Sequence, residues 1–210
     1  MSRIIGVNSL HVAKMKTDGA DGATWDAPVK VPSVINVEIT DNKENVTFYS
    51  DDVIEQVLPA FSGKEVTIEL GYLTNELEAL VSGNTYKNGV FVQSANAIAD
   101  NFALLLKAPK SKGGERYLCL YKGVLSKDED KYQGKGENVE SSNVTLKGVF
   151  MPLEFNSSPM IKIDTDDDKL DAAGKTLVQK WFTEVPLPTA AAEAETQATR
   201  ARATETKAVK

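Results

Sequence analysis

The sequence predicts a mainly β protein: a two-sheet β-sandwich or barrel with one short flanking α-helix and long loops. Two observations carry this prediction. First, apolar and polar residues alternate in many segments, for example over residues 35–40 and 66–71. Side chains on a strand point to opposite faces in turn, so the alternation predicts sheets with one dry face and one polar face. Second, helical patterns are few, and short strands at fairly regular spacing are typical of sandwiches and barrels.

In the first half of the chain, strand patterns alternate with turn signals. The predicted strands cover residues 10–15, 34–40, 46–50 and 64–72. We expect residues 42–44 to break the second strand from the third. Residues 51–63 fit neither the strand nor the helix period and contain Pro59 and Gly63, so we expect a long loop there. Loops of that length are uncommon unless they are functional.

One short helix is predicted over Asn75–Ser82. Thr74 is a suitable N-cap, apolar residues follow at helical spacing, and Gly83 provides the stop. In the second half of the chain, the predicted strands cover residues 89–93, 101–107, 115–126, 142–155 and 159–164. Residues 127–143 are charged and glycine-rich and should form a second exposed loop. Pro152 indicates a bend or a sheet edge, and residues 172–182 have the pattern of a last amphipathic turn or two of helix.

The composition changes after Pro186 and Pro188, which divides the chain into a folded domain, residues 1–188, and a tail, residues 189–210. The tail consists of alanine, threonine and charged residues with no apolar period. Such a segment buries too little surface to offset its ordering entropy. We expect it to be disordered, or to form a weak solvent-exposed helix.

Charge and cysteine content restrict the class of protein. The net charge is −6 and the isoelectric point is near 5.0, which argues against a nucleic-acid reader that works through a basic patch. The single cysteine excludes an intrachain disulfide and fits a thiol-protecting compartment. We find neither a secretory signal nor an apolar stretch of membrane-spanning length. We therefore expect a soluble protein made in a cytosol, with no membrane partner.

Residues that carry chemistry are few, and each has a structural interpretation. His11 is the only histidine and lies on a predicted strand without an identifiable partner carboxylate or nucleophile. Cys119 lies in the middle of a strand and is expected to be a buried, inert thiol. The Gly113–Gly114 pair precedes a strand instead of a helix, so it is not a phosphate-binding loop. We expect no enzyme activity and no catalytic residues.

An acidic cluster is the strongest candidate for a metal site. It comprises Asp164, Asp166, Asp167, Asp168 and Asp171. The first positions match the opening of a calcium loop, but Lys169 replaces the glycine and Lys175 replaces the bidentate glutamate. Solvated loop acids with an N-cap role are the preferred interpretation. The basic residues Lys107, Lys110 and Lys112 are interrupted by Pro109 and have no aromatic residues among them, so they predict no nucleic-acid site. We expect no metal and no cofactor.

Taken in order, several segments resemble the major tail proteins of long-tailed, non-contractile bacteriophages. They are IGVNSLHVAKM (5–15), PVKVPSVINVEI (28–39), VTFYSDD (46–52), KEVTIELGYLTNELEALVSG (64–83), RYLCLYKGVLS (116–126) and VTLKGVFMP (144–152). The resemblance covers residues 4–183. It rests on colinear order, because none of the segments is a chemical signature.

The resemblance implies a structural virion protein of the tail-tube type. Family members form a sandwich or barrel with a flanking helix and assemble into hexameric rings. The rings stack around a tape-measure protein into a tube that later conducts double-stranded DNA without binding it specifically. The implied partners are other copies of the subunit, the tape-measure protein, the tail terminator and the distal tail or baseplate proteins.

The family's functional elements are surfaces, so the resemblance assigns regions. It implies ring stacking by residues 41–63, with candidate residues Asp51, Asp52, Val53, Ile54, Leu58 and Phe61. It implies subunit contacts by the N-terminal arm and residues 127–143. It also implies a hydrophilic lumen, where carboxylates would repel DNA phosphates. Glu38, Glu65 and Glu69 are candidates for that lining; the alternative is ordinary solvent exposure.

Other classes of protein remain open at this point. A secretion-system inner-tube protein shares the tube architecture. A carbohydrate-binding β-sandwich would need a row of exposed aromatic residues, whereas aromatics make up only 7% of the chain and Trp25 and Trp181 are far apart in sequence.

The tail gives the first prediction. Because residues 189–210 lack the pattern of a packed element, a chain that ends at residue 188 should form the same tubes as the full chain, as measured by electron microscopy. Loss of tubes on truncation would contradict the assignment of the tail as dispensable.

Overall fold

A computed structural model describes residues 2–50, 53–130 and 143–188. Within these ranges the protein is mainly β and sandwich-like, with a large antiparallel sheet, a small two-stranded sheet and two helices. The elements in chain order are β1 (Ser9–Gly19), β2 (Gly22–Trp25), β3 (Val29–Val31), β4 (Val34–Ser50), β5 (Val53–Leu70), α1 (Asn75–Ser82), β6 (Thr85–Lys87), β7 (Val90–Val92), β8 (Phe102–Pro109), β9 (Glu115–Lys127), β10 (Val144–Met151), β11 (Met160–Asp164) and α2 (Ala172–Lys180).

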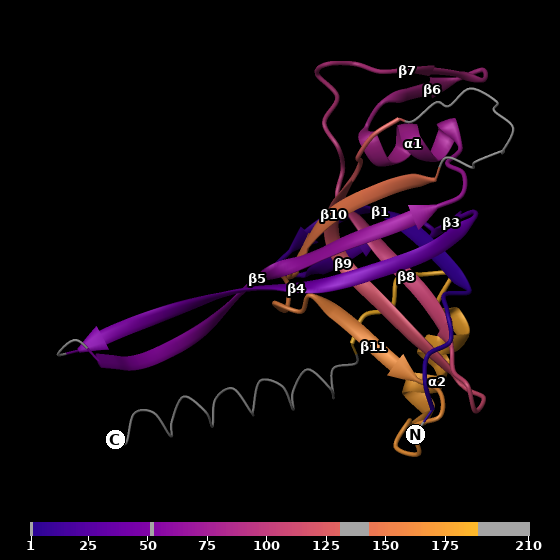
Figure 1. Cartoon of the computed structure of the whole chain (residues 1–210). Helices are drawn as coiled ribbons and strands as arrows, with labels where there is room; N and C mark the ends of the chain where they lie inside the picture. The colour runs from indigo at the N-terminus through magenta and orange to yellow at the C-terminus, as the bar shows by residue number, and fades with distance from the viewer. Residues whose placement is uncertain (1, 51–52, 131–142, 189–210) are drawn as a thin grey trace, which may run out of the picture.

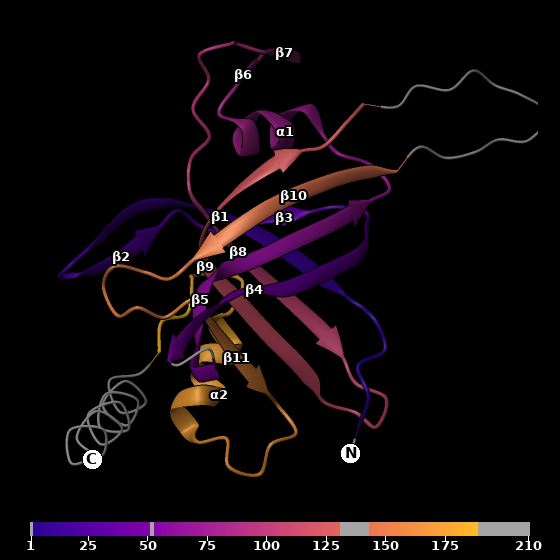
Figure 2. The same ribbon diagram turned by 60° about the vertical axis from the view of Figure 1, so that its left-hand side comes forward.

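The large sheet has the order β2-β1-β8-β9-β10-β5-β4 and branches at two strands. β9 pairs with β11 over Arg116–Leu120 and with β10 over Lys122–Lys127. β1 likewise pairs with β3 near its start and with β2 near its end. Strands that change partners along their length divide a sheet and let it fold over a core. The limb β9-β10-β5-β4 therefore curves over the strands β1 and β8 (Figures 1 and 2).

Two hydrophobic clusters lie on the two sides of this sheet. The larger one is enclosed by the curved sheet and α1, and includes Leu10, Ile68, Phe102 and Leu77. The other lies under α2 and the segment after it, around Trp181 and Tyr121. Figures 1 and 2 show the two helices at opposite ends of the body. β8 lies between the clusters, so Phe102–Leu106 are all buried and lack the alternation of a strand with one wet face.

The predicted helix is confirmed together with both of its caps. The Thr74 hydroxyl accepts a hydrogen bond from the Leu77 amide at 3.2 Å. Gly83 ends the helix in the left-handed region, at φ 69°, and its N–H donates to the Ala79 carbonyl. A Cβ at Gly83 would lie 2.1 Å from the Ile98 carbonyl oxygen, so both conformation and space require glycine.

The prediction of a long loop over residues 51–63 is wrong. Residues 53–63 belong to β5, and β4 continues through residues 42–44 to Ser50, with shifts of register between Asn42 and Lys43 and between Phe48 and Tyr49. The predicted strands over 34–40, 46–50 and 64–72 and the predicted loop therefore belong to one long pair of strands, β4 and β5. Pro59 does not prevent this, because proline is tolerated in strands that lie at a sheet edge.

Other boundaries change less. β10 ends at Met151, before Pro152, and β11 begins at Met160. The C-terminal helical pattern is a second helix, α2, for which Asp171 is the N-cap. Most of the predicted 127–143 loop and the 189–210 tail lie outside the described residues.

Candidate assembly surfaces

The outer sheet face is the exposed surface of β4, β5, β10 and β9, away from the larger core. Its residues are Asn36, Glu38, Thr40, Glu65, Thr67, Glu69, Thr145, Lys147, Val149, Val124 and Ser126. On β5 these residues alternate with the buried Val66, Ile68 and Leu70. Directly paired residues of an antiparallel sheet share a face. Glu38 pairs with Thr67, and Glu69 pairs with Asn36 and Thr145.

The structure brings the three candidate lumen acids, Glu38, Glu65 and Glu69, together on this face. Glu69 accepts a hydrogen bond from the Asn143 amide at 2.7 Å, and Glu65 accepts one from Asn42 at 3.4 Å. Lys147 lies on the same face, but its ammonium group pairs with Asp128 at 2.9 Å. The face therefore has a negative balance along β4 and β5.

The outer sheet face also has an apolar corner that sequence reasoning missed. Val149 and Val124 are direct cross-strand partners and are 50% and 36% exposed. In the sequence each belongs to an alternating strand, and the alternation did not show that two apolar residues meet on the wet side.

The outer sheet face ends at two unlike edges, neither of which has a further strand partner among the described residues. β4 is the last strand of the sheet, and within the described chain it pairs only with β5. On the other side, β8 reaches β9 only as far as Gly123, so Val124–Lys127 have β10 as their one strand partner among the described residues. The Lys127 ammonium at this second edge pairs with Glu78 of α1 at 3.0 Å. Unpaired backbone donors and acceptors at a sheet edge are a template for another strand.

A two-stranded ribbon projects from the body (Figure 1). β10 supports β5 only over Lys64–Leu70, whereas β4 and β5 pair with each other as far as Ser50 and Val53. We call the unsupported part, residues 42–50 and 53–63, the ribbon. A ribbon of two strands is at best marginally stable in water. It therefore needs a partner that the subunit itself does not supply in the described structure.

Of the six candidate stacking residues, the ribbon contains the four that the structure describes: Val53, Ile54, Leu58 and Phe61. Asp51 and Asp52 lie outside the described residues. Val53 and Ile54 lie at the far end of the ribbon with large exposed fractions, 67% and 56%. Leu58 pairs with Val46 within the ribbon, and Phe61 lies near its base. The region predicted to stack rings is thus an extended hairpin instead of a loop.

The base of the ribbon is a bulge that we call the neck, formed by residues 41–43 and 61–64. Ser62 is skipped in the strand register, and its hydroxyl donates to the Asn42 carbonyl at 3.1 Å. The Lys64 ammonium contacts the Asp41 carboxylate and lies 5.7 Å from the Phe61 ring centroid. Hydrogen bonds from Lys64 and Lys43 lower the pKa of Asp41, which keeps this carboxylate ionised.

The N-terminal arm, residues 2–8, follows the edge of the β8–β9 hairpin. The Ile5 and Asn8 amides donate to the Pro109 and Lys107 carbonyls at 3.0 and 2.8 Å. The Ser2 hydroxyl donates to Asp166 at 3.1 Å. The resemblance implies subunit contacts by this arm; in the subunit it is bound to its own chain.

The acidic cluster is divided between ion pairs and a helix cap. Arg116 donates to both Asp164 oxygens at 2.7 and 2.6 Å, and Lys110 contacts Asp164 and Asp166. The prediction of solvated acids is therefore wrong for the half-buried Asp164, whereas Asp166 is exposed and also pairs with Lys110. The N-cap role is correct for Asp171, which accepts from the Gly174 amide at 2.7 Å. No group of three or more acidic, histidine or cysteine side chains among the described residues is arranged to hold a metal ion.

The remaining chemical candidates have structural surroundings. The His11 ring stacks on Phe182 with ring centroids 4.2 Å apart, and partial burial lowers the pKa of His11. Cys119 is fully buried, which raises the pKa of its thiol well above the ordinary value. Lys107 pairs with Glu115 at 2.7 Å. The stacking contact covers one face of the His11 ring, whereas its Nδ1 is buried without a hydrogen-bond partner among the described residues.

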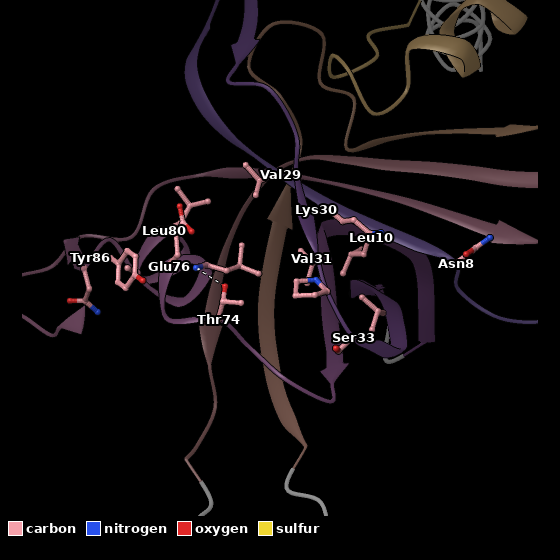
Figure 3. A pocket seen from close by; sticks show the side chains of 15 residues that line it. Asn8, Leu10, Val29, Lys30, Val31, Ser33, Thr74, Glu76, Leu80 and Tyr86 are labelled. Carbon is pink, nitrogen blue, oxygen red and sulfur yellow. Dashed lines mark hydrogen bonds between the residues drawn. The ribbon is translucent and has the colours of Figure 1, made fainter. Parts of the chain in front are cut away.

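A cleft of about 900 Å³ lies between α1 and β3, at the end of the body where β4 begins and β5 ends. Figure 3 shows its two sides, with Leu80, Glu76 and Tyr86 on one and Val29, Lys30 and Leu10 on the other. We call it the α1–β3 cleft. Sequence reasoning missed it because its two sides come from segments far apart in the chain.

Comparison with protein-family models finds no family that matches this sequence, and comparison with curated proteins finds no relative. None of the helices in the described part of the chain has the length and apolar character needed to cross a membrane.

The neck gives a prediction about stability. Gly63 has φ +145°, and a Cβ there would lie 2.8 Å from the Phe150 carbonyl oxygen. Gly63→Ala should lower the free energy of unfolding by about 1–3 kcal/mol, as measured by urea denaturation. Gly19→Ala is the matched control, because a Cβ at Gly19 meets nothing within 4 Å. Equal effects of the two substitutions would contradict the role assigned to the neck.

The Asp164 ion pair gives a prediction about pH. Its hydrogen bonds with Arg116 lower the pKa of Asp164 to about 2. Because the folded-state pKa lies below the unfolded value, the stabilisation is complete above pH ~4 and is lost as the pH falls towards ~2. Asp164→Asn should lower the free energy of unfolding by about 2 kcal/mol at pH 7, and the gap from wild type should close over that window.

Urea midpoints measured at several pH values test this prediction, with Asp168→Asn as the control because Asp168 is exposed. A gap between wild type and Asp164→Asn that stays constant from pH 7 to pH 2 would refute it.

Proposed function

We propose that this protein is a structural subunit of a tube, of the kind formed by the major tail proteins of non-contractile phages. In this proposal the subunits form rings, six to a ring as in the family that the sequence resembles, and the rings stack around a tape-measure protein. The observation that carries the proposal is a sheet with two unlike edges and a projecting ribbon, none of which has a further strand partner among the described residues.

Ring closure uses the two edges of the outer sheet face. The β4 edge of one subunit would pair with the β9 edge at Val124–Lys127 of the next. A contact between unlike surfaces repeats around an axis and closes when the rotation allows it. Pairing every limb with its neighbours would remove the free edges that otherwise promote aggregation.

Closing the ring in this way would turn one side of the limb towards the axis. We assign the outer sheet face to the lumen, because its negative balance suits the passage of DNA without binding. Glu38, Glu65 and Glu69 would line the channel. An assembled structure with these carboxylates on the outer wall would rule out this assignment.

Other partners follow from the same proposal. The ends of a tube need a terminator and a distal tail or baseplate complex, and the virion tail would be the site of action after synthesis in the host cytoplasm.

A secretion-system inner tube would share all the surfaces described above, and only the neighbouring genes would separate the two. The carbohydrate-binding alternative loses support, because Trp181 is buried under α2 and is not available for an aromatic platform.

Negative-stain microscopy of the concentrated, purified chain tests the proposal. We expect rings or tubes with a central channel. Monodisperse monomers at every protein and salt concentration would contradict it. The variant Val124→Lys places a charge at the proposed ring edge and should shift the protein towards monomers, whereas Lys175→Glu on the exposed side of α2 should not.

A further inference from the structure

We propose that the α1–β3 cleft is the receptor for the tip of the ribbon of a second copy of this chain. The inference rests on the proposed tube function and adds the surface that the ribbon binds. It concerns the described tip residues Val53 and Ile54 and the cleft between α1 and β3.

The tip of the ribbon carries large apolar side chains that are exposed in the subunit. Val53 and Ile54 are consecutive, large and more than half exposed, and Val53 forms the last described pair of the ribbon, with Ser50. Consecutive residues of a strand point to opposite faces, so the end of the unsupported ribbon carries an exposed apolar side chain on each of its two faces. An element with this character is suited to insertion between the two apolar sides of a cleft. Glu55 follows them, and residues 51–63 contain no lysine or arginine.

The lining of the α1–β3 cleft is also largely apolar. Its floor consists of the buried Leu10, Val31 and Leu77, which belong to the larger core. Its rim is apolar and accessible, since Val29 is 48% exposed and Tyr86 is 40% exposed. The volume of about 900 Å³ lies in the range of pockets that hold a ligand, and it exceeds what two branched side chains need.

Charge gives the contact an orientation. Of the lining residues, Lys30 is the one base and Glu76 the one acid, and they lie on opposite sides of the cleft (Figure 3). A tip that carries Glu55 and no base is attracted to the β3 side, at Lys30, and repelled by the α1 side.

The strongest argument is position. The cleft is lined by residues immediately before β4 and immediately after β5, whereas the tip is at the other end of the same two strands. β4 has 17 residues, so the two sites are separated by about 55 Å along the strand direction. Translation of a second copy along β4 and β5 therefore brings its tip to the cleft. A head-to-tail contact of this kind does not close and generates a stack.

Disulfide trapping between two populations of subunits tests the receptor. Ile54→Cys subunits are mixed with Leu80→Cys subunits under conditions of assembly and then oxidised. Each subunit carries one engineered thiol, and the natural Cys119 is fully buried, so a bond must join two chains. Val53→Cys with Val29→Cys is a second pair, and Ile54→Cys with Val149→Cys, on the exposed sheet face, is the matched control.

We expect the cleft pairs to give about tenfold more cross-linked dimer than the control pair, because docking raises the local concentration of the two thiols. Loss of assembly only in the mixtures with a cleft cysteine, while the control mixture assembles, also supports the receptor. Tubes that cross-link equally well at Val149 would overturn it and leave the proposed function standing. Monomers of the wild-type chain at all concentrations would overturn the proposed function as well.

Discussion

The structure depends on one mismatch of length: β4 and β5 are longer than the sheet that supports them. β10 covers β5 only from Lys64 to Leu70, and β4 and β5 continue to Ser50 and Val53 with no third strand partner in the described part of the chain. Two strands alone do not bury enough surface for independent stability. The ribbon is therefore incomplete within the described subunit. The neck forms its base, and the α1–β3 cleft lies at the other end of the same two strands, β4 and β5.

The body behind the ribbon has the features of a rigid support. β8 is covered on both faces, and Arg116 and Lys110 hold the end of β11 through Asp164. Asp18 at the end of β1 pairs with Lys122 at 2.7 Å and accepts the Glu154 amide at 3.1 Å, which fixes the segment after β10. These contacts join segments that are distant in sequence, so they stabilise the body from which the ribbon projects.

Sequence patterns predicted the parts of this fold in which one rule decides the local structure. Alternation identified the buried face of β5, and Thr74 and Gly83 gave the ends of α1. The ribbon was missed because Pro59 and Gly63 have the signature of a loop, although both are compatible with an edge strand and a bulge. The ion pairs of Asp164 and the α1–β3 cleft could not be predicted, because each joins segments that only the tertiary fold brings together.

The subunit has two pairs of differing surfaces, one pair across the sheet and one pair along the strands. These differences restrict the geometry of any assembly that the surfaces form. Across the sheet, the β4 edge differs from the β9 edge; along the strands, the apolar tip differs from the cleft. A contact between unlike edges can close into a ring, and a contact between unlike ends remains open and repeats. The two proposed contacts share β4, which forms one edge of the sheet and one strand of the ribbon, so a subunit placed in the proposed ring would also direct its ribbon to the next layer. In the proposed assembly, the ring contact and the stacking contact together would generate a tube.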